Sequence, residues 1–241
     1  MSYINGVIFI GRDPRVQYSG ACYHIIQRGN NQEKIFKRDK EKLFFLELLR
    51  AVRIKFNCLI FAYTIMDNHY HLLIQIQTEN LSQIMHRLNS RYAQYYNWRH
   101  NRKGHVFQGR FLSYLITDDL YLVTVLRYIH QNAVRARIVE NISEYRWCSD
   151  RDYRNQLNDL VETSFVLDIF SKDRQKALQI YSELMGEPLT DKEKKMAYEK
   201  FYHDPFQTKT EADIKSNGII PSIQIPDRSG FLDEILKSCC S

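Results

Sequence analysis

Two short segments of the chain contain residue types that could act on a phosphodiester. The first is a histidine pair, His69 and His71, inside an apolar run. Residues i and i+2 of a strand project from the same face, so the two imidazoles could bind one divalent ion together. An HxH tripeptide in a hydrophobic strand is more often an accident of packing. However, apolar residues 72–74 predict an interior strand, where histidines without partners would carry a desolvation cost.

The second segment places a tyrosine four residues before an asparagine. On a helix, Tyr128 and Asn132 are at i and i+4 and share one face. A free phenol, with a pKa of about 10, is a poor nucleophile. Attack on a phosphodiester becomes feasible where a cation polarises the phosphate, and the Asn132 carbonyl offers a third, neutral metal ligand. Most of the 16 tyrosines must be structural, so only the combination with the histidines makes Tyr128 a candidate nucleophile.

Positive charge is concentrated in one part of the chain. The formal net charge is +6, yet residues 80–117 contain no Asp or Glu at all. Basic residues and aromatic residues alternate there, a composition typical of surfaces that bind single-stranded nucleic acid, although a solvated helix with core aromatics is the plainer alternative. The candidate DNA-binding residues are Arg87, Arg91, Arg99, Arg102, Lys103 and Arg110.

Periodicity and turn residues predict the elements that must position these groups. We expect strands at 21–27, 59–65, 69–77 and 106–116, and helices at 39–56, 81–99 and 118–133, the last capped by Asp118. This β-α-β-β-α-β order, followed by a helix, predicts an α+β fold. It matches the ferredoxin-like split βαββαβ arrangement, an antiparallel sheet backed by two helices on one face.

Beyond the catalytic unit, expected at residues 1–152, the character of the sequence changes. Short helices are expected at 167–170, 174–185 and 191–202, within a helical extension of residues 153–202 packed on that unit. A polar linker should span 203–229. Residues 230–241 begin as an amphipathic helix and are too short for a helix-turn-helix.

The five cysteines are odd in number and lack CxxC spacing, which excludes a disulfide framework or a zinc site as an interpretation. A reducing cytoplasm therefore fits. The apolar runs are too short to span a membrane, and no signal peptide is expected.

Four ordered blocks resemble the single-tyrosine HUH transposases, also called IS200-like transposases, and in particular their REP-associated tyrosine transposase branch. The blocks are YHIIQRGNN at 23–31, MDNHYHLLI at 66–74, GHVFQGRF at 104–111 and RYIHQNAVRA at 127–136. A fifth segment, YRWCS at 145–149, is similar to the family's Tyr-x-Trp-Ser-Ser.

The resemblance implies a transposase that cleaves and rejoins single-stranded or hairpin DNA. It makes His69, His71 and Asn132 ligands of Mg²⁺ or Mn²⁺, and Tyr128 the nucleophile that forms a 5′-phosphotyrosine and frees a 3′-hydroxyl. Arg110 would contact DNA or have a structural role. No organic cofactor is expected, because there is no phosphate-binding glycine loop. The protein could act as a monomer or a homodimer.

One position departs from the family pattern. The family usually has Asn-Pro where this chain has Asn132-Ala133, and losing the proline could loosen the helix end that positions Asn132. Three alternatives stay open: an HUH relaxase or replication initiator, a catalytically idle DNA-hairpin-binding protein, and a metal-dependent hydrolase. The hydrolase would need an acidic ligand or base near His69, and only Asp67 is close in sequence.

Overall fold

The histidine pair lies on an interior strand of a four-stranded antiparallel sheet. The strands are β3 (Cys22–Arg28), β4 (Leu59–Ile65), β5 (His69–Gln75) and β6 (Leu112–Ile116), in the order β4-β5-β3-β6. In this computed structural model, residues 17–77, 81–157, 159–194 and 197 are described, with the backbone of β1 (Tyr3–Ile4) and β2 (Val7–Ile8), which pair antiparallel. The expected interior position of β5 is confirmed.

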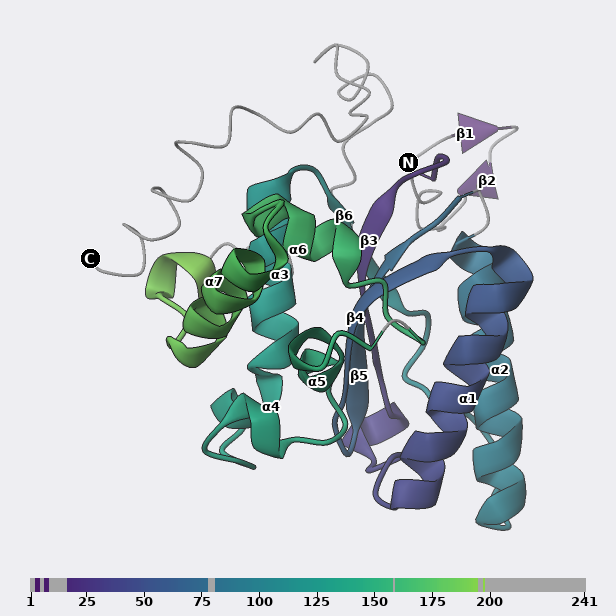
Figure 1. Cartoon of the computed structure of the whole chain (residues 1–241). Coiled ribbons are helices and arrows are strands. Elements are labelled where there is room, and N and C mark those ends of the chain that lie inside the picture. The colour runs from purple at the N-terminus through teal and green to yellow at the C-terminus, as the bar shows by residue number, and fades with distance from the viewer. Residues whose placement is uncertain are drawn as a thin grey trace.

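Helices cover both faces of the sheet (Figure 1). On one face lie α1 (Asp39–Phe56) and α2 (Leu81–Arg99), where the β5 residue Tyr70 packs with its ring centroid 4.5 Å from that of Phe45. On the other face lies α3 (Asp119–His130), whose Ile129 carbonyl accepts a 2.6 Å hydrogen bond from Thr64 of β4. The order of elements and the two helices on one face confirm the expected ferredoxin-like fold.

The helix that carries Tyr128 is interrupted earlier than its sequence predicts. As expected, the Asp118 side chain caps α3 by accepting a 2.7 Å hydrogen bond from the backbone of Tyr121. The expected helix at 118–133 is wrong in one respect, because α3 ends at His130 and a short helix, α4 (Asn132–Arg135), follows. Gln131, with φ −79° and ψ 1°, separates the two because this ψ departs from the helical value.

The last strand of the sheet is also shorter than predicted. Residues 106–116 were expected to form a strand, but β6 begins at Leu112. Gly104 and Gly109 have φ values of 96° and 62°, and these left-handed conformations turn the chain. The resulting loop is bound to the end of β3, where Asn30 N donates to Val106 O over 2.8 Å and Gln108 N donates to Arg28 O over 2.9 Å.

The C-terminal extension packs on the α3 side of the molecule. Its helices are α5 (Asp150–Arg154), α6 (Ser164–Phe170) and α7 (Arg174–Gly186), and short 3-10 turns occur at η1 (Asn30–Gln32) and η2 (Ile142–Glu144). Helix α5 was not predicted. Residues 191–194 and 197 are helical, and the rest of the helix expected at 191–202, the linker at 203–229 and the segment 230–241 lie outside the described residues.

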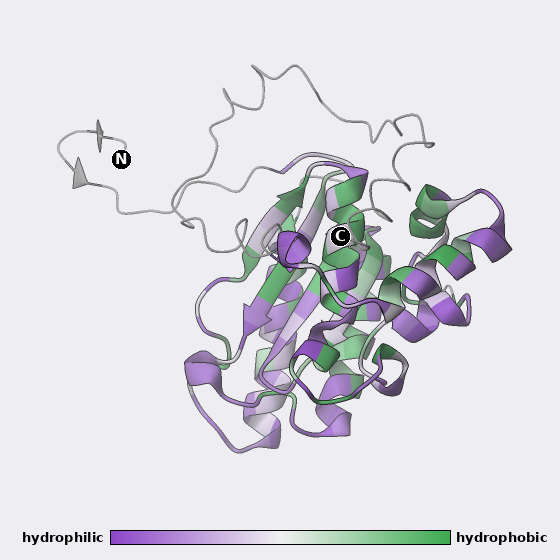
Figure 2. Cartoon of the chain, turned by 90° about the vertical axis from the view of Figure 1, so that its left-hand side faces the viewer, coloured by the Kyte–Doolittle hydropathy of each residue, from purple (hydrophilic) through white to green (hydrophobic). Residues whose placement is uncertain are grey.

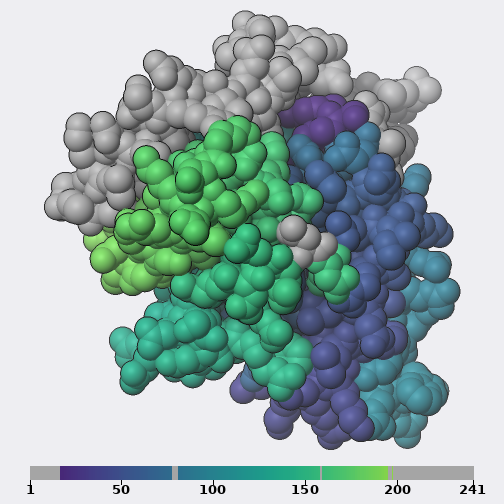
Figure 3. Space-filling view, viewed as in Figure 1, coloured from purple at the N-terminus to yellow at the C-terminus, as the bar shows by residue number. Residues whose placement is uncertain are grey.

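Hydrophobic residues concentrate on the sheet and on the helix faces that cover it, whereas the outer turns are hydrophilic (Figure 2). In the space-filling view, the green extension lies directly against the blue half of the molecule that contains β4 and α1 (Figure 3). Cys22, Cys58 and Cys148 are buried free thiols. Within the described part of the chain, none of the helices is both long and apolar enough to cross a membrane.

Candidate active site

The strand geometry places His69 and His71 on the sheet face that α3 covers. Tyr70, between them, points to the opposite face and is fully buried. Strand β3 pairs with β5 so that Arg28 lies opposite His69 and Ile26 opposite His71. The shared face predicted from the i, i+2 spacing is therefore present, and β3 contributes its own residues to that face.

A neighbour holds the Nδ1 atom of each histidine. Nδ1 of His71 lies 2.9 Å from Nε2 of His24, a buried residue of β3, and Nδ1 of His69 lies 2.7 Å from Oδ1 of Asn68. Histidines that bind metals commonly have their other ring nitrogen held in this way, which orients the ring and selects the tautomer. In both rings, the Nε2 atom is then the nitrogen that could bind a metal.

Asn132, the first residue of α4, connects the two histidines. Its Nδ2 atom lies 3.1 Å from Nε2 of His71, and its side chain also hydrogen-bonds to His69. A 180° turn of the amide would direct the oxygen instead of the nitrogen at His71. Two imidazole nitrogens and one amide oxygen form a donor set that fits a divalent ion. No group of three or more His, Cys, Asp or Glu side chains in the described residues is placed to hold a metal, so the amide would complete the set.

The Tyr128 ring lies against this cluster. Its centroid is 5.4 Å from that of His71 and 5.9 Å from that of His24. The guanidinium of Arg135, a residue of α4, lies 4.5 Å from the centroid of the Tyr128 ring. Tyr128 is buried, with 6% of its surface exposed. The structure thus brings all four predicted site residues together, in a single chain, and adds His24 and Arg135 to them.

Burial keeps these histidines neutral. It lowers the pKa of His24 to about 3 and that of His69 to about 4, where a hydrogen bond that His69 donates to Asn132 opposes the shift and the charge of Arg28 adds to it. Burial also lowers the pKa of His71 well below its usual value, and the nearby histidines and Arg135 lower it further. A neutral imidazole keeps the lone pair that metal coordination requires, so the site is suited to a cation at neutral pH.

The carboxylate nearest in sequence is bound to lysines. Asp67 lies 3.1 Å from Nζ of Lys42, a residue of α1, and 3.6 Å from Nζ of Lys34. These two cations compensate its charge. A hydrolase that uses Asp67 as ligand or base would have to break both ion pairs.

The six candidate DNA-binding residues do not form one cluster. Five are exposed: Arg87, Arg91, Arg99, Lys103 and Arg110. Helix α2 lies on the sheet face away from α3, whereas Arg110 lies in the loop bound to the end of β3. Arg102 is half-buried and forms a 2.8 Å ion pair with Glu33, so part of the charge of this acid-free stretch is compensated from another segment.

Sequence reasoning missed His24, Arg28 and Arg135 as neighbours of the site. His24 and Arg28 alternate along β3 in the same block that carries the family resemblance, YHIIQRGNN, and this alternation was the available signal. Their relation to β5 depends on the register between the strands, which local spacing does not specify.

Comparison with known protein families gives one match. The model of a family described as IS200-like transposase matches residues 17–132, a range that contains His24, both β5 histidines, Tyr128 and Asn132. No curated protein gives a significant match. The structure of a REP-associated tyrosine transposase bound to a REP hairpin is 15% identical, with a TM-score of 0.53, and the match covers 65% of this chain and 93% of that one. This likeness shows a shared fold.

A crystal structure of a protein from Deinococcus radiodurans R1, assigned as a transposase, is also similar. It is 13% identical with a TM-score of 0.36, and the match covers 49% of this chain and 95% of that one.

Proposed function

The resemblance seen in the sequence is confirmed by the match of residues 17–132 to the IS200-like transposase family, and on this premise we propose that the protein is a metal-dependent DNA strand transferase. Its substrate would be single-stranded or hairpin DNA, cut and rejoined through a 5′-phosphotyrosine. The observation that carries the proposal is the contact of the Tyr128 ring with His71, whose Nε2 atom faces Asn132.

In the proposed reaction, the Tyr128 oxygen attacks the phosphorus of the scissile phosphodiester. A bond forms between the phenolic oxygen and phosphorus, the bond from phosphorus to O3′ breaks, and the phenol's proton is transferred to solvent while the leaving oxygen takes one up. The product is a 5′-phosphotyrosine and a free 3′-hydroxyl. Attack by the 3′-hydroxyl of the same or another strand reverses these changes, so the bond energy is conserved and no nucleotide cofactor is needed.

The divalent ion, Mg²⁺ or Mn²⁺, would be held by His69, His71 and Asn132 and would polarise the scissile phosphate. His24 and Asn68 keep the two rings oriented with Nε2 toward Asn132. Arg28 and Arg135, whose charges act on the β5 histidines, add positive charge where a phosphate would bind.

The DNA partner is supported by the excess of positive charge and by the fold. The relative of similar fold is bound to a REP hairpin, and we propose a hairpin or single strand for this chain as well. Because Tyr128 contacts His71 within one chain, we expect a monomer to contain a complete site.

An idle hairpin-binding protein is the main alternative function, and one assay separates the two. Labelled single-stranded hairpin DNA is incubated with the protein and Mn²⁺, and the products are separated on a denaturing gel. We expect a covalent DNA–protein adduct that is lost in Tyr128→Phe. The matched control is Tyr114→Phe, since Tyr114 also lies near His24, with ring centroids 6.3 Å apart.

The outcomes discriminate clearly. An adduct in the wild type and in Tyr114→Phe but not in Tyr128→Phe supports the strand transferase. Cleavage that persists in Tyr128→Phe would falsify it in favour of a hydrolase. Hairpin binding without any cleavage would instead identify a catalytically idle hairpin-binding protein.

A further inference from the structure

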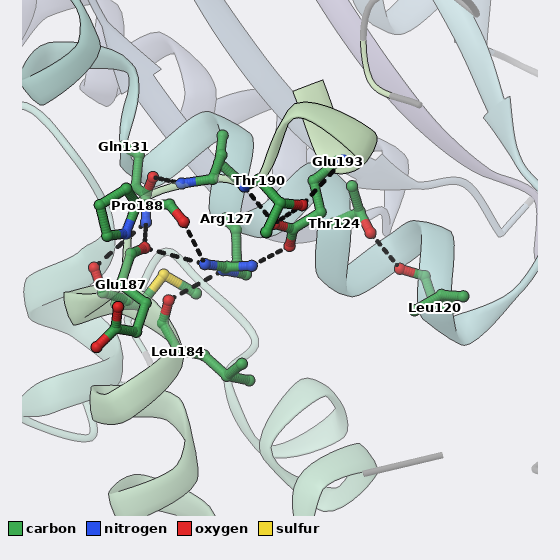
Figure 4. Close-up of polar contacts among 11 residues, drawn as sticks. Leu120, Thr124, Arg127, Gln131, Leu184, Glu187, Pro188, Thr190 and Glu193 are labelled. Carbon is green, nitrogen blue, oxygen red and sulfur yellow. Dashed lines mark hydrogen bonds and ion pairs between the residues drawn. The ribbon is translucent and has the colours of Figure 1, made fainter. Parts of the chain in front are cut away.

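Helix α3 is bound to the C-terminal extension through Arg127 (Figure 4). This side chain is fully buried. Its Nε donates to the Leu184 carbonyl over 2.9 Å, one terminal nitrogen donates to the Glu187 carbonyl over 2.9 Å, and the other forms an ion pair with Glu193. Arg127 directly precedes Tyr128, so its position constrains the backbone of the candidate nucleophile.

One turn later, Gln131 makes a second connection to the same segment. Its Nε2 donates to the Glu187 carbonyl over 2.6 Å, and its Oε1 accepts from the Leu189 backbone over 3.2 Å. Gln131 is also the residue at which α3 passes into α4, directly before Asn132. Residues 184–193, which we call the clamp segment, therefore bind the two positions adjacent to the nucleophile and to the third candidate ligand.

A third contact comes from α7. His130, which lies between Arg127 and Gln131 in the sequence, is buried, and its Nε2 atom lies 2.8 Å from the Ser149 hydroxyl. Its Nδ1 atom lies 2.9 Å from the hydroxyl of Tyr181, a residue of α7, and this hydroxyl donates to Asp150 over 2.7 Å. Separating the two groups of a buried ion pair leaves each charge buried without a partner, which costs free energy. We therefore expect the clamp segment and α3 to move together. The family match ends at residue 132, whereas the clamp segment lies beyond it.

We propose that the clamp segment is a positioning element of the active site, which holds Tyr128 against His71 through Arg127 and Gln131. This inference rests on the proposed function of Tyr128 as nucleophile. Releasing the clamp segment would leave the sheet and its histidines in place but allow the Tyr128 helix to shift. The clamp segment would thus control the covalent step and not the binding of DNA.

Glu193→Gln is the variant that releases the clamp with the smallest change in shape. One Glu193 oxygen pairs with Arg127, and the other accepts from the backbone and hydroxyl of Thr190, both over 2.8 Å. A glutamine has a single acceptor oxygen, so its NH₂ group would face the donors of Arg127 or Thr190. Arg127 itself is a poor test, because removing it would leave several buried carbonyls unpaired and could unfold the protein.

Asp191→Asn is the matched control. Asp191 lies two residues away, its side chain is 98% exposed, and it pairs with Lys194 over 2.8 Å. The substitution removes the same negative charge from the same segment without touching α3. Any difference between Glu193→Gln and Asp191→Asn therefore reports on the clamp and not on net charge.

The first measurement is the rate of covalent adduct formation in a single turnover with excess full-length protein. A displacement of the nucleophile by about 1 Å can slow a reaction on the order of 100-fold, and we expect at least a ~10-fold loss in Glu193→Gln. Asp191→Asn should react at the wild-type rate, and both variants should bind the hairpin as the wild type does. A wild-type adduct rate in Glu193→Gln, or an equal loss in both variants, would overturn the proposal.

The second measurement does not depend on activity. A fluorinated tyrosine is incorporated at position 128 by codon suppression, and its ¹⁹F resonance is recorded for the folded protein without DNA. We expect a shifted or additional resonance in Glu193→Gln and an unchanged one in Asp191→Asn. An unchanged resonance in a Glu193→Gln protein that melts at a lower temperature would overturn the positioning role and leave only a structural one. If the wild type forms no adduct, the proposed function fails, whereas the resonance still decides the clamp.

Discussion

His24 and His71 meet across strands β3 and β5, with Nε2 of His24 2.9 Å from Nδ1 of His71 and ring centroids 5.2 Å apart. Nε2 of His71 faces Asn132, so the proton shared between the two histidines belongs on the Nδ1 side of His71 if Nε2 is to bind a metal. A third histidine thus sets the tautomer of a candidate ligand.

The first prediction concerns this support. We expect His24→Phe, which preserves the ring but removes its nitrogens, to weaken Mn²⁺ binding by about 10–100-fold, as for other outer partners of metal-binding histidines. His71→Ala should remove measurable binding. Isothermal titration calorimetry measures the Mn²⁺ affinity of both variants. The control is His86→Phe, at an exposed histidine of α2. An unchanged affinity in His24→Phe would show that His71 needs no such partner.

The second prediction concerns Asn132. Asn132→Asp replaces a neutral oxygen donor by a charged one and should tighten Mn²⁺ binding, whereas Asn132→Ala should weaken it because one ligand is lost. Mn²⁺ titration followed by electron paramagnetic resonance gives both affinities. Equal affinity in Asn132→Ala and the wild type would exclude Asn132 from the metal site.

The third prediction concerns stability at low pH. Burial lowers the pKa of His24 to about 3 and of His130 to about 4 in the folded protein, whereas an unfolded histidine titrates near 6.5. Between these pH values the unfolded chain binds more protons than the folded protein. The contribution of these histidines to the free energy of unfolding is therefore fully present above pH ~6.5 and is lost as the pH decreases. Each such histidine reduces the free energy of unfolding by up to about 1.4 kcal/mol per pH unit.

One carboxyl group opposes this trend. Burial raises the pKa of Asp152 to about 6, so its protonation favours the folded state between that value and its usual range near 4. Several histidines outweigh one carboxyl, and urea unfolding at pH 7.5, 6.5 and 5.5 should show the loss. In His130→Gln the decline should be shallower than in the wild type. A parallel decline in both would contradict the assignment of His130.

The fourth prediction concerns the turn after β3. A Cβ added at Gly29 would lie 2.3 Å from the carbonyl oxygen of Glu33, and the Gly29 backbone donates to Asn68 O over 2.7 Å. Gly29→Ala must displace this turn, and we expect it to lower the free energy of unfolding by roughly 1–3 kcal/mol. Gly186→Ala, with open space around its Cβ at the end of α7, is the control and should not destabilise. Denaturant unfolding compares the two, and equal stability would refute the clash.

The fifth prediction concerns DNA contact by α2. Trp98 is 79% exposed beside Arg99 and offers a face on which an unpaired base could stack. Trp98→Ala should weaken single-strand binding by about 1–3 kcal/mol. Ile54→Ala removes another apolar side chain, 73% exposed on α1, and should have no effect. Fluorescence anisotropy with a labelled oligonucleotide measures both, and equal affinities would remove α2 from the proposed DNA surface.

Much of the fold and the candidate site could be predicted because local spacing reflects backbone geometry. The period of two in a strand places His69 and His71 on one face, and the helical pattern locates Tyr128 and Asn132 at the end of the same helical region, although Gln131 interrupts it. The cap at Asp118 and the order of strands and helices are also local signals, and the structure confirms them. These features need no knowledge of what packs against each element.

Contacts between distant segments were decided by the tertiary structure alone. The register of β3 against β5 brings His24 to His71, Glu33 compensates Arg102, and the extension binds Arg127. Gln131 interrupts the helix where it binds the clamp segment. The sequence by itself thus determined which residues share a face of one element. Only packing determined their partners, because register and burial depend on chain segments that are far apart along the sequence.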